Sequence, residues 1–224
     1  MVVKVYGALT AMVWLVICVL KEKNVPYELI DVDLASGEHK SPAFLQKHPF
    51  GQTPYIDDDG FILYESRAIC YYIVVKYGNQ GTPNLVPPPS DLQATALFQQ
   101  AVMVESHNFH IYAQPAVKER IYHPFYYATE CNTALYNQYL STLEEKLEAY
   151  NGILGRQKYL AGDTLTLADL YHLPYGTLLN EIPGCEVMRK YPNVARWFDE
   201  LSSRQSWREI QAMIKGMYDS VLQA

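Results

Sequence analysis

The chain has 224 residues, of which 49% are hydrophobic and 19% are charged, a balance typical of folded globular proteins and too apolar for a disordered chain. The formal net charge of −6 argues against a nucleic-acid partner, because phosphate backbones require a basic surface. The cysteines show neither a CxxC pair nor a zinc-type spacing, which indicates free thiols in a reducing, cytoplasmic compartment and no metal site.

Residues 8–20, ALTAMVWLVICVL, form an apolar stretch near the start of the chain. It is too short for a helix that spans a bilayer, which needs roughly 20 residues. Its length fits the core of a secretory signal, but only Lys4 precedes it, and the charged segment KEK follows where a cleavage site would be. We therefore predict a helix that is buried on nearly all sides and extends to Lys23, with no membrane association.

The first 78 residues alternate between strand and helix patterns. A strand at 2–6 precedes the buried helix and a second strand at 27–34 follows it, which makes a βαβ unit. A loop with a short helix covers 36–51, and two short strands joined at DDG follow within 53–65. A helix at 66–77, ended by Gly78, completes this α/β domain.

The second part of the chain has only helical patterns. Residues 79–91, NQGTPNLVPPPSD, are rich in proline and small polar residues and are predicted to be a linker. Helical periodicity then covers 92–119, with a kink expected at Pro115, followed by 132–154, 167–180, 194–201 and 207–218. The sequence therefore predicts an α/β domain followed by an all-α domain.

Three segments in this order resemble the glutathione transferases, in particular the phi class of plants and its fungal relatives: SGEHKSPAFLQKHPFGQTPYI, LYESRAICYYI and YLAGDTLTLADLYHLP. Close similarity covers mainly residues 36–77 and 159–174, while the order of elements matches over the whole chain. The resemblance implies a thioredoxin-like glutathione-binding domain (1–78), a linker (79–91) and an all-α domain (92–224) with a hydrophobic substrate site. It also implies a homodimer, with contacts from Pro49-Phe50 and from the helix at Arg67, and glutathione as co-substrate.

The segment GQTPY resembles the part of the family that pairs with the backbone of glutathione. The resemblance implies a cis bond before Pro54, which leaves the N–H and C=O groups of Thr53 free to pair with the cysteine residue of glutathione. Gln52 matches a position that contacts the same backbone. Without the family pattern, an ordinary turn before an edge strand is the favoured interpretation of the segment.

Two further segments imply contacts to the two ends of glutathione. His39 and Lys40 match positions that bind the glycine carboxylate, a role that cationic or N–H donors suit, although a solvated loop is the alternative. Glu65 and Ser66 lie between a strand and a helix and match positions that hold the γ-glutamyl end, where Ser66 is alternatively a plain N-cap. Arg67 is a further candidate for a carboxylate, with a surface or subunit-contact role as its alternative.

The segment TLTLADL predicts a capping box, in which Thr166 and Asp169 bond each other's backbone at a helix start. We assign this motif a folding role and no chemistry. His172, three residues further on, is predicted to be a packed core histidine.

The start of the buried helix departs from the family pattern. Phi-class enzymes have a serine there that donates a hydrogen bond to the glutathione sulfur, followed by a basic pair; here Thr10 and Trp14-Leu15 align with them. A threonine hydroxyl can donate the same bond, and a helix N-terminus favours a thiolate. Thr10 is therefore either the residue that activates the sulfur or a plain N-cap. Tyr6, at the end of the first strand, is a weaker candidate.

The expected second-substrate site lies beside the sulfur, lined by Met12 from the first helix and by His107, Phe109 and Tyr112 from the helix after the linker. The implied function is the joining of the glutathione thiolate to hydrophobic electrophiles, and peroxide reduction would use the same thiolate. The altered helix start leaves an alternative, a ligand-binding or carrier protein with weak or lost catalysis. A pure interaction module would not need all the glutathione motifs.

Overall fold

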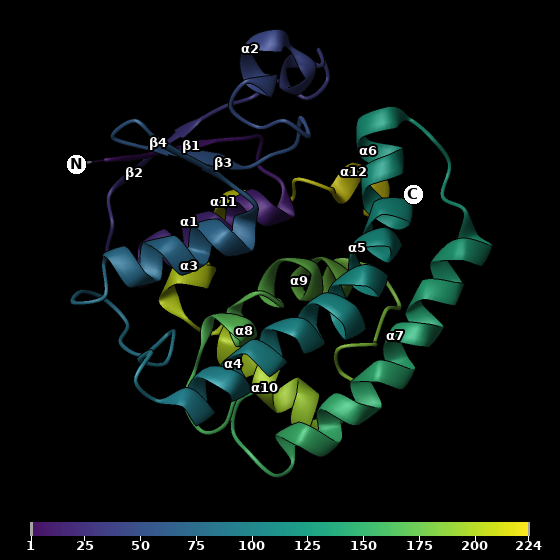
Figure 1. The fold of residues 1–224 in the computed structure, drawn as a ribbon. Helices are drawn as coiled ribbons and strands as arrows, with labels where there is room; N and C mark the ends of the chain where they lie inside the picture. Colours follow the sequence, from purple (N-terminus) through teal and green to yellow (C-terminus); the bar gives the residue numbers. More distant parts are fainter. Residues whose placement is uncertain (1, 224) are drawn as a thin grey trace. The chain divides into compact units, whose positions relative to one another are not determined.

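The computed structural model describes residues 2–223 (Figure 1). The chain forms two compact units, one ending at Val86 and the other beginning at Pro87. The N-terminal unit contains a mixed sheet with the strand order β2-β1-β3-β4. Its strands are β1 (Val3–Tyr6), β2 (Tyr27–Ile30), β3 (Tyr55–Asp58) and β4 (Phe61–Tyr64). Only β1 and β2 are parallel. This is the predicted thioredoxin-like arrangement, and the prediction of the fold class is confirmed.

Two longer helices cover one face of this sheet. They are α1 (Ala11–Glu22) and α3 (Ser66–Lys76), which pack against each other (Figure 1). Val3 and Val5 of β1 are fully buried while Lys4 between them is exposed, the alternation expected of a strand with one covered face. In α1, Ala11 and every residue from Val13 to Leu20 are buried, so the prediction of a helix covered on nearly all sides is confirmed.

The opposite face of the sheet carries a smaller apolar cluster. It lies beneath the short helix α2 (Pro42–Leu45) and the 3-10 turn η1 (Glu38–Lys40). The rings of Tyr6 and Tyr55 stack with centroids 4.5 Å apart, and Phe44 of α2 meets Tyr55 edge-on at 5.1 Å. Burial raises the pKa of the Tyr55 phenol to about 12. Tyr6 therefore contributes to packing on this face.

The start of the predicted linker is held against α1. The Lys23 ammonium donates to the Thr82 carbonyl at 2.9 Å, the Gln80 amide donates to the Lys23 carbonyl at 2.8 Å, and the Thr82 hydroxyl donates to the Glu22 carboxylate. Residues 79–86 therefore cluster with the N-terminal unit, and the boundary between the units lies at 86–87.

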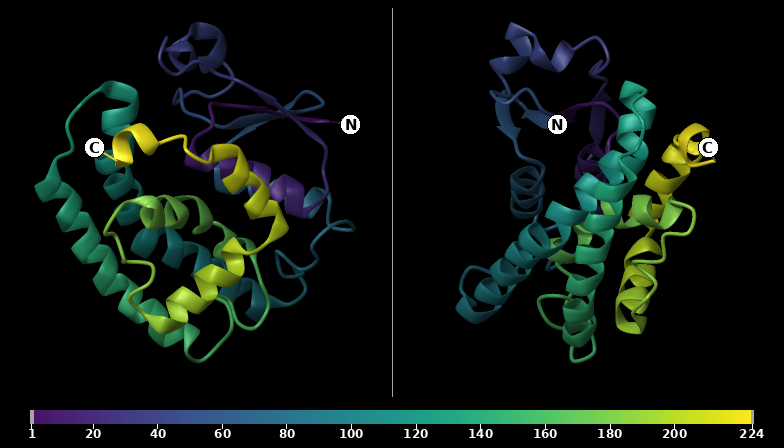
Figure 2. Two further views of the ribbon diagram at one scale, coloured as in Figure 1. Left: turned by 180° about the vertical axis from the view of Figure 1, so that it is seen from behind. Right: turned by 90° about the vertical axis from the view of Figure 1, so that its right-hand side faces the viewer.

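The C-terminal unit is helical (Figure 2). A first helical run contains α4 (Leu92–Glu105), α5 (Ile111–Val117) and α6 (His123–Tyr127), joined by the π-helical turns η2 (Ser106–His110) and η3 (Lys118–Tyr122). The helical run therefore continues to Tyr127 and is interrupted by two π turns, so the prediction of one helix at 92–119 is wrong in where the helix ends and in its regularity. Pro115 lies inside α5, and its missing N–H precedes the second π turn.

The remaining helices agree with the predicted positions but are more finely divided. The run 167–180 is split at Tyr171-His172, and the run 207–218 is interrupted where Gly216 takes a φ of +75°, a left-handed conformation that favours glycine. The remaining helices are α7 (Thr133–Leu154), α8 (Leu167–Leu170), α9 (Leu173–Glu181), α10 (Pro192–Ser202), α11 (Gln205–Ile214) and α12 (Asp219–Leu222). The long helix α7 packs against α5 and α10 (Figure 2).

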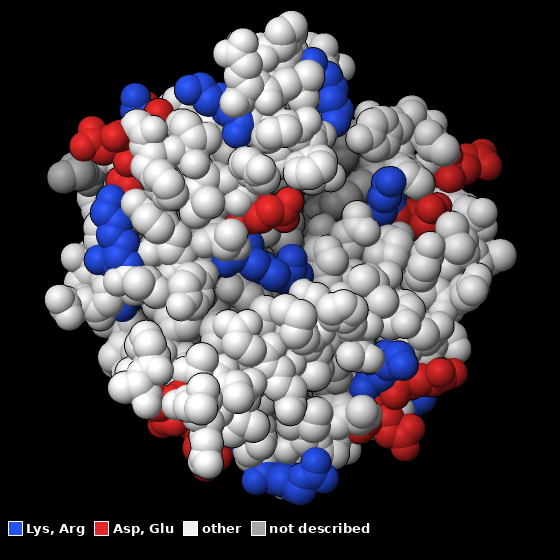
Figure 3. All heavy atoms as spheres, viewed as in Figure 1, with Lys and Arg blue, Asp and Glu red and all other residues white. Residues whose placement is uncertain are grey.

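Charged side chains are dispersed over the face drawn in Figure 3, where Lys and Arg alternate with Asp and Glu. One exposed ion pair joins Lys158 to Glu200 at 2.8 Å, and such exposed pairs contribute little stability. Across residues 2–223, no helix combines the length and the apolar character needed to cross a membrane.

Candidate functional site

The site in the N-terminal unit begins at the turn between β1 and α1. A methyl group at Gly7 would lie 2.6 Å from the Val13 Cγ2 atom and 3.2 Å from the Thr53 Cβ atom. Only a glycine therefore lets this turn approach the Thr53-Pro54 turn so closely. The contact places the start of α1 beside the residues predicted to pair with a peptide backbone.

Thr10 is the N-cap residue of α1, with an extended backbone, and its carbonyl accepts the first helical hydrogen bond from the Trp14 N–H at 3.0 Å. Its side chain makes no capping hydrogen bond, so the hydroxyl does not serve as a side-chain N-cap. The first turn of α1 has no acidic residue. A half-buried hydroxyl thus stands at the positive end of a helix, where a thiolate is favoured.

The Thr53–Pro54 peptide bond is cis, as the family resemblance implied. Pro54 is buried and Thr53 is half-buried. Within residues 2–223, the N–H and C=O groups of Thr53 make no hydrogen bond to another backbone segment. Both groups are therefore able to pair with an extended peptide. The neighbouring Gln52 side chain is exposed.

The start of α3 is conformationally unusual. Glu65, its N-cap residue, has φ +71° and ψ +106°, a region that costs a non-glycine residue about 1–3 kcal/mol and that clusters at functional sites. The Glu65 carboxylate makes no capping bond, and the residue is exposed. Ser66 is the first helical residue and not the N-cap, so the plain-cap interpretation of Ser66 is wrong. Arg67 follows it and is half-buried.

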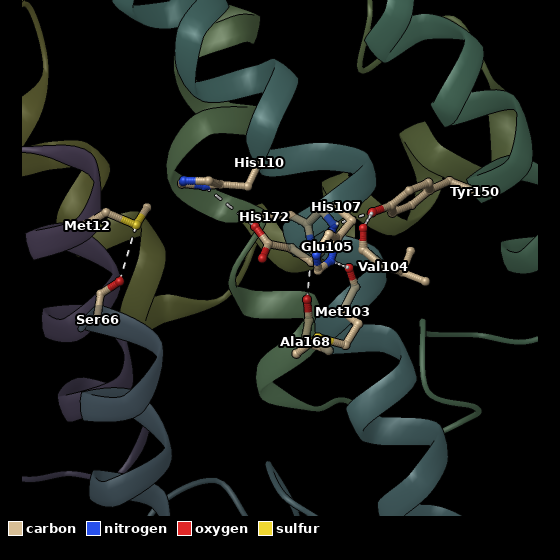
Figure 4. A network of polar contacts seen from close by, with 10 residues as sticks. All are labelled: Met12, Ser66, Met103, Val104, Glu105, His107, His110, Tyr150, Ala168 and His172. Carbon is tan, nitrogen blue, oxygen red and sulfur yellow. Dashed lines mark hydrogen bonds and ion pairs between the residues drawn. The ribbon is translucent and has the colours of Figure 1, made fainter.

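A hydrogen bond brings the starts of the two helices together. The buried Ser66 hydroxyl donates to the Met12 sulfur at 3.4 Å (Figure 4). A thioether is a weak acceptor, so a carboxylate would bind this hydroxyl more strongly. Thr10 on α1 and the Glu65-Ser66 pair on α3 therefore lie at the same end of the helix pair. Met12, predicted to line the second-substrate site, is also at this end.

His39 and Lys40 lie on η1, which follows a left-handed glycine at position 37. The Lys40 ammonium donates to the carbonyls of Gly51 at 2.7 Å and of Phe50 at 3.2 Å, so its side chain is held in place and is not a freely solvated loop group. The Nδ1 atom of His39 is buried and has no hydrogen-bond partner among residues 2–223, an unsatisfied polar group of the kind that points to a functional site. Burial, together with the Lys40 charge, lowers the pKa of His39.

The three residues predicted for the hydrophobic site in the C-terminal unit differ in how exposed they are. His107 is exposed, with its Nδ1 atom 2.9 Å from the Met103 carbonyl, and Tyr112 is half-buried. Phe109 is fully buried, and its ring centroid lies 4.6 Å from that of His172. Phe109 therefore belongs to the core of this unit, and its assignment as a substrate-lining residue is corrected.

His172 is a core histidine, as predicted. Its Nδ1 atom lies 2.9 Å from the Ala168 carbonyl, and its Nε2 atom lies 3.1 Å from the Tyr150 hydroxyl (Figure 4). Because a carbonyl can only accept, Nδ1 donates to Ala168, while Nε2 lies beside the Tyr150 hydroxyl, which also donates to the Val104 carbonyl at 3.4 Å. The ring is thus a packed structural group of the core.

The sequence pattern missed a buried carboxylate in the same unit. Glu105 ends α4 with no exposed surface, and its Oε1 atom lies 4.0 Å from the Nδ1 atom of His110 (Figure 4). The π turn at 106–110 brings residues five apart onto one face. In a regular α-helix these two residues lie on different faces, so the helical period of the sequence does not pair them.

The thioredoxin-like unit with its cis-proline turn and its paired helix starts, followed by a helical unit, is the arrangement of the glutathione transferase fold. The model of the glutathione S-transferase N-terminal domain matches residues 1–75, and that of the C-terminal domain matches residues 111–205. The chain belongs to the glutathione S-transferase family.

Individual relatives agree with the predicted phi-class and fungal resemblance. The chain is 42% identical over 199 residues to glutathione S-transferase PM239X14 of Arabidopsis thaliana, covering 88% of this chain and 89% of the relative. It is 37% identical over 207 residues to glutathione S-transferase hmp2 of Hypomyces subiculosus, covering 92% and 96%. Among solved structures, glutathione transferase F7 of Populus trichocarpa superposes with a TM-score of 0.88 at 35% identity, covering 94% and 98%. Glutathione S-transferase I of maize, in complex with an atrazine glutathione conjugate, has a TM-score of 0.88 at 31% identity, covering 96% and 99%.

Proposed function

We propose that this transferase joins the thiolate of glutathione to hydrophobic electrophiles and that Thr10 donates a hydrogen bond to the sulfur. The observation that carries the proposal is the Thr10 hydroxyl, which stands at the N-terminus of α1 without capping it. The maize relative solved with an atrazine glutathione conjugate supports the class of product.

The chemistry needs only a stabilised thiolate and a positioned partner. The sulfur attacks the electrophilic carbon, a C–S bond forms, and the leaving group departs with its bonding electrons. Each unit by which the thiol pKa falls corresponds to about 1.4 kcal/mol of preference for the thiolate. Holding both reactants together supplies the rest of the acceleration through proximity.

Glutathione itself would be held at three places along its length. Lys40 and the unsatisfied Nδ1 atom of His39 suit the glycine carboxylate, and the Thr53 backbone suits the central cysteine. Ser66 at the start of α3 suits the γ-glutamyl carboxylate, and Glu65 suits its ammonium. Gln52 and Arg67 are secondary candidates for the backbone and for a carboxylate.

The carrier alternative rested on the altered helix start. Trp14 and Leu15, which stand at the basic pair of phi-class enzymes, are fully buried. This departure therefore changes the packing of α1, while the hydroxyl position is kept by Thr10. That pattern supports an enzyme over a carrier that has lost its thiol-activating group.

The function is tested by mixing the wild-type protein with glutathione and chlorodinitrobenzene, an aromatic electrophile whose conjugate absorbs in the near ultraviolet. We expect formation of the conjugate to be saturable in glutathione. A parallel assay with an organic hydroperoxide tests peroxide reduction, in which the sulfur attacks the peroxide oxygen and a second glutathione releases the disulfide. Glutathione binding without either turnover would favour the carrier.

The homodimer stays a prediction, as does the cytoplasmic location. Phe50 is 65% exposed on the loop after α2, and Tyr71 and Val75 are exposed one turn apart on α3. Apolar side chains in such positions favour a subunit contact. We expect light scattering at working concentration to give twice the mass of one chain; the mass of a single chain would contradict the prediction.

A further inference from the structure

His48 is a buried histidine of the N-terminal unit, and none of the roles described above uses it. Only 2% of its surface is exposed. Its ring stacks on Tyr64 with centroids 4.7 Å apart, lies 6.4 Å from the ring of Phe44 and meets Phe50 edge-on at 6.3 Å. Phe50 and Tyr64 also meet edge-on at 6.3 Å. We call these four residues the His48 ring cluster.

Hydrogen bonds connect the His48 ring cluster to the residues suited to the glycine carboxylate. The Gly51 N–H donates to the His48 carbonyl at 2.8 Å. The carbonyls of Gly51 and Phe50 in turn accept the hydrogen bonds that fix Lys40. Gly51 has a φ of +57°, and a methyl group there would lie 2.7 Å from the His39 carbonyl. The loop at 48–51 thus supports both His39 and Lys40.

The cluster also adjoins the residues suited to the γ-glutamyl end of glutathione. Tyr64, which stacks on His48, is the last residue of β4 and directly precedes the strained residue Glu65. A backbone in a sparsely populated conformation persists only when its surroundings hold it there. The stacked ring of Tyr64 is one such contact, so His48 lies between the two ends of the glutathione site.

We propose that His48 is a positioning residue, which fixes the separation between His39-Lys40 and Glu65-Ser66 and thereby sets the affinity for glutathione. This inference rests on the proposed function. Glutathione carries a carboxylate at each end, so both ends are held at full strength only when the two groups of residues are correctly spaced. Loss of the ring would therefore weaken binding more than chemistry.

The neutral form of the imidazole suits this cluster. Burial lowers the pKa of His48, the Glu65 carboxylate opposes that shift, and the Lys40 ammonium adds to it. A histidine with a lowered pKa in the fold contributes stability that is present above its ordinary pKa of about 6.5 and is lost as the pH falls below it. Free glutathione does not change its charge between about pH 5 and 7, and titration of the bound thiol is common to wild type and to any variant that keeps the thiol-activating groups. As the pH falls through the lowered pKa of His48, protonation of its ring should therefore add a loss of glutathione affinity.

The test compares His48→Ala, which removes the ring, with His48→Phe, which keeps a ring but cannot be protonated. At about pH 7.5 we expect His48→Ala to raise the Kd for glutathione about tenfold, with kcat at saturating glutathione within about twofold of wild type. His48→Phe should bind within about twofold of wild type. As the pH falls from about 7.5 to about 5, wild type should lose more affinity than His48→Phe.

Ile73→Ala provides a matched control, because Ile73 is fully buried on α3 and lies outside the cluster. It should destabilise the same unit without changing the Kd for glutathione. Equal increases of Kd in His48→Ala and Ile73→Ala, or an unchanged Kd in His48→Ala, would overturn the positioning role. Where His48→Ala does not fold, the same pH dependence in His48→Phe and wild type overturns it. Absence of binding by wild type would instead overturn the proposed function, and the inference with it.

Discussion

Replacing Thr10 with alanine should lower the turnover of conjugation by about 10- to 100-fold, because a hydrogen bond to a charged group contributes about 1.5–3 kcal/mol. The lost bond is the one to the thiolate, whereas the groups suited to the ends of glutathione, such as Lys40 and Ser66, stay in place. We therefore expect the Kd for glutathione to change little. The measurement is steady-state conjugation at saturating glutathione, alongside calorimetric titration.

The pH profile of the same variant separates thiol activation from a structural effect. Without the hydroxyl, the thiol pKa should rise, and the turnover should recover as the pH increases. Thr10→Ser is the matched control, because it keeps the hydroxyl and should retain most of the turnover. An unchanged turnover in Thr10→Ala would remove Thr10 from the mechanism and leave the amide groups at the N-terminus of α1 as the thiolate ligand.

Replacing Asp169 with alanine should lower the free energy of unfolding by about 3–5 kcal/mol, because the buried donors that bond to it would lose their acceptor. The Asp169 carboxylate is fully buried and accepts hydrogen bonds from the N–H groups of Leu160 at 2.9 Å and Thr166 at 3.0 Å and from the Trp197 indole at 3.0 Å. Each buried donor left without an acceptor costs about 1–3 kcal/mol. Urea unfolding followed by tryptophan fluorescence gives the value.

Asp163→Ala is the matched control for that measurement. Its carboxylate accepts one exposed hydrogen bond, from the Lys158 N–H at 3.1 Å, so the loss should stay below about 1 kcal/mol. Asp169→Asn keeps one acceptor oxygen and should lie between the two. Equal losses in Asp169→Ala and Asp163→Ala would show that the Asp169 network does not hold the helical unit together.

Much of the fold could be predicted from local patterns. The apolar run through α1, the alternation of Val3, Lys4 and Val5, and the reach of Asp169 back to the Thr166 N–H all follow from periodicity and capping. The interrupted helical run from 92 to 127 could not be predicted in this way. Its π turns shift the helical face by one residue, so Phe109 turns into the core and Glu105 pairs with His110.

The glutathione residues depended on the family resemblance, because their roles arise from tertiary contacts. Lys40 is fixed by carbonyls ten and eleven residues away, and Glu65 is defined by a backbone conformation that its residue type does not signal. His48 has no local pattern at all. Its neighbours Phe44, Phe50 and Tyr64 come together only when α2 folds over the end of β4.

Activation of the glutathione sulfur by the Thr10 end of α1 underlies the proposed function. The most direct measurement is a titration of the wild-type protein with glutathione across pH, recording the heat of binding and the ultraviolet absorbance of the bound thiolate. We predict that bound glutathione is already a thiolate near neutral pH, well below the ordinary thiol pKa of about 8.5. Binding of the neutral thiol over the same range would contradict this activation.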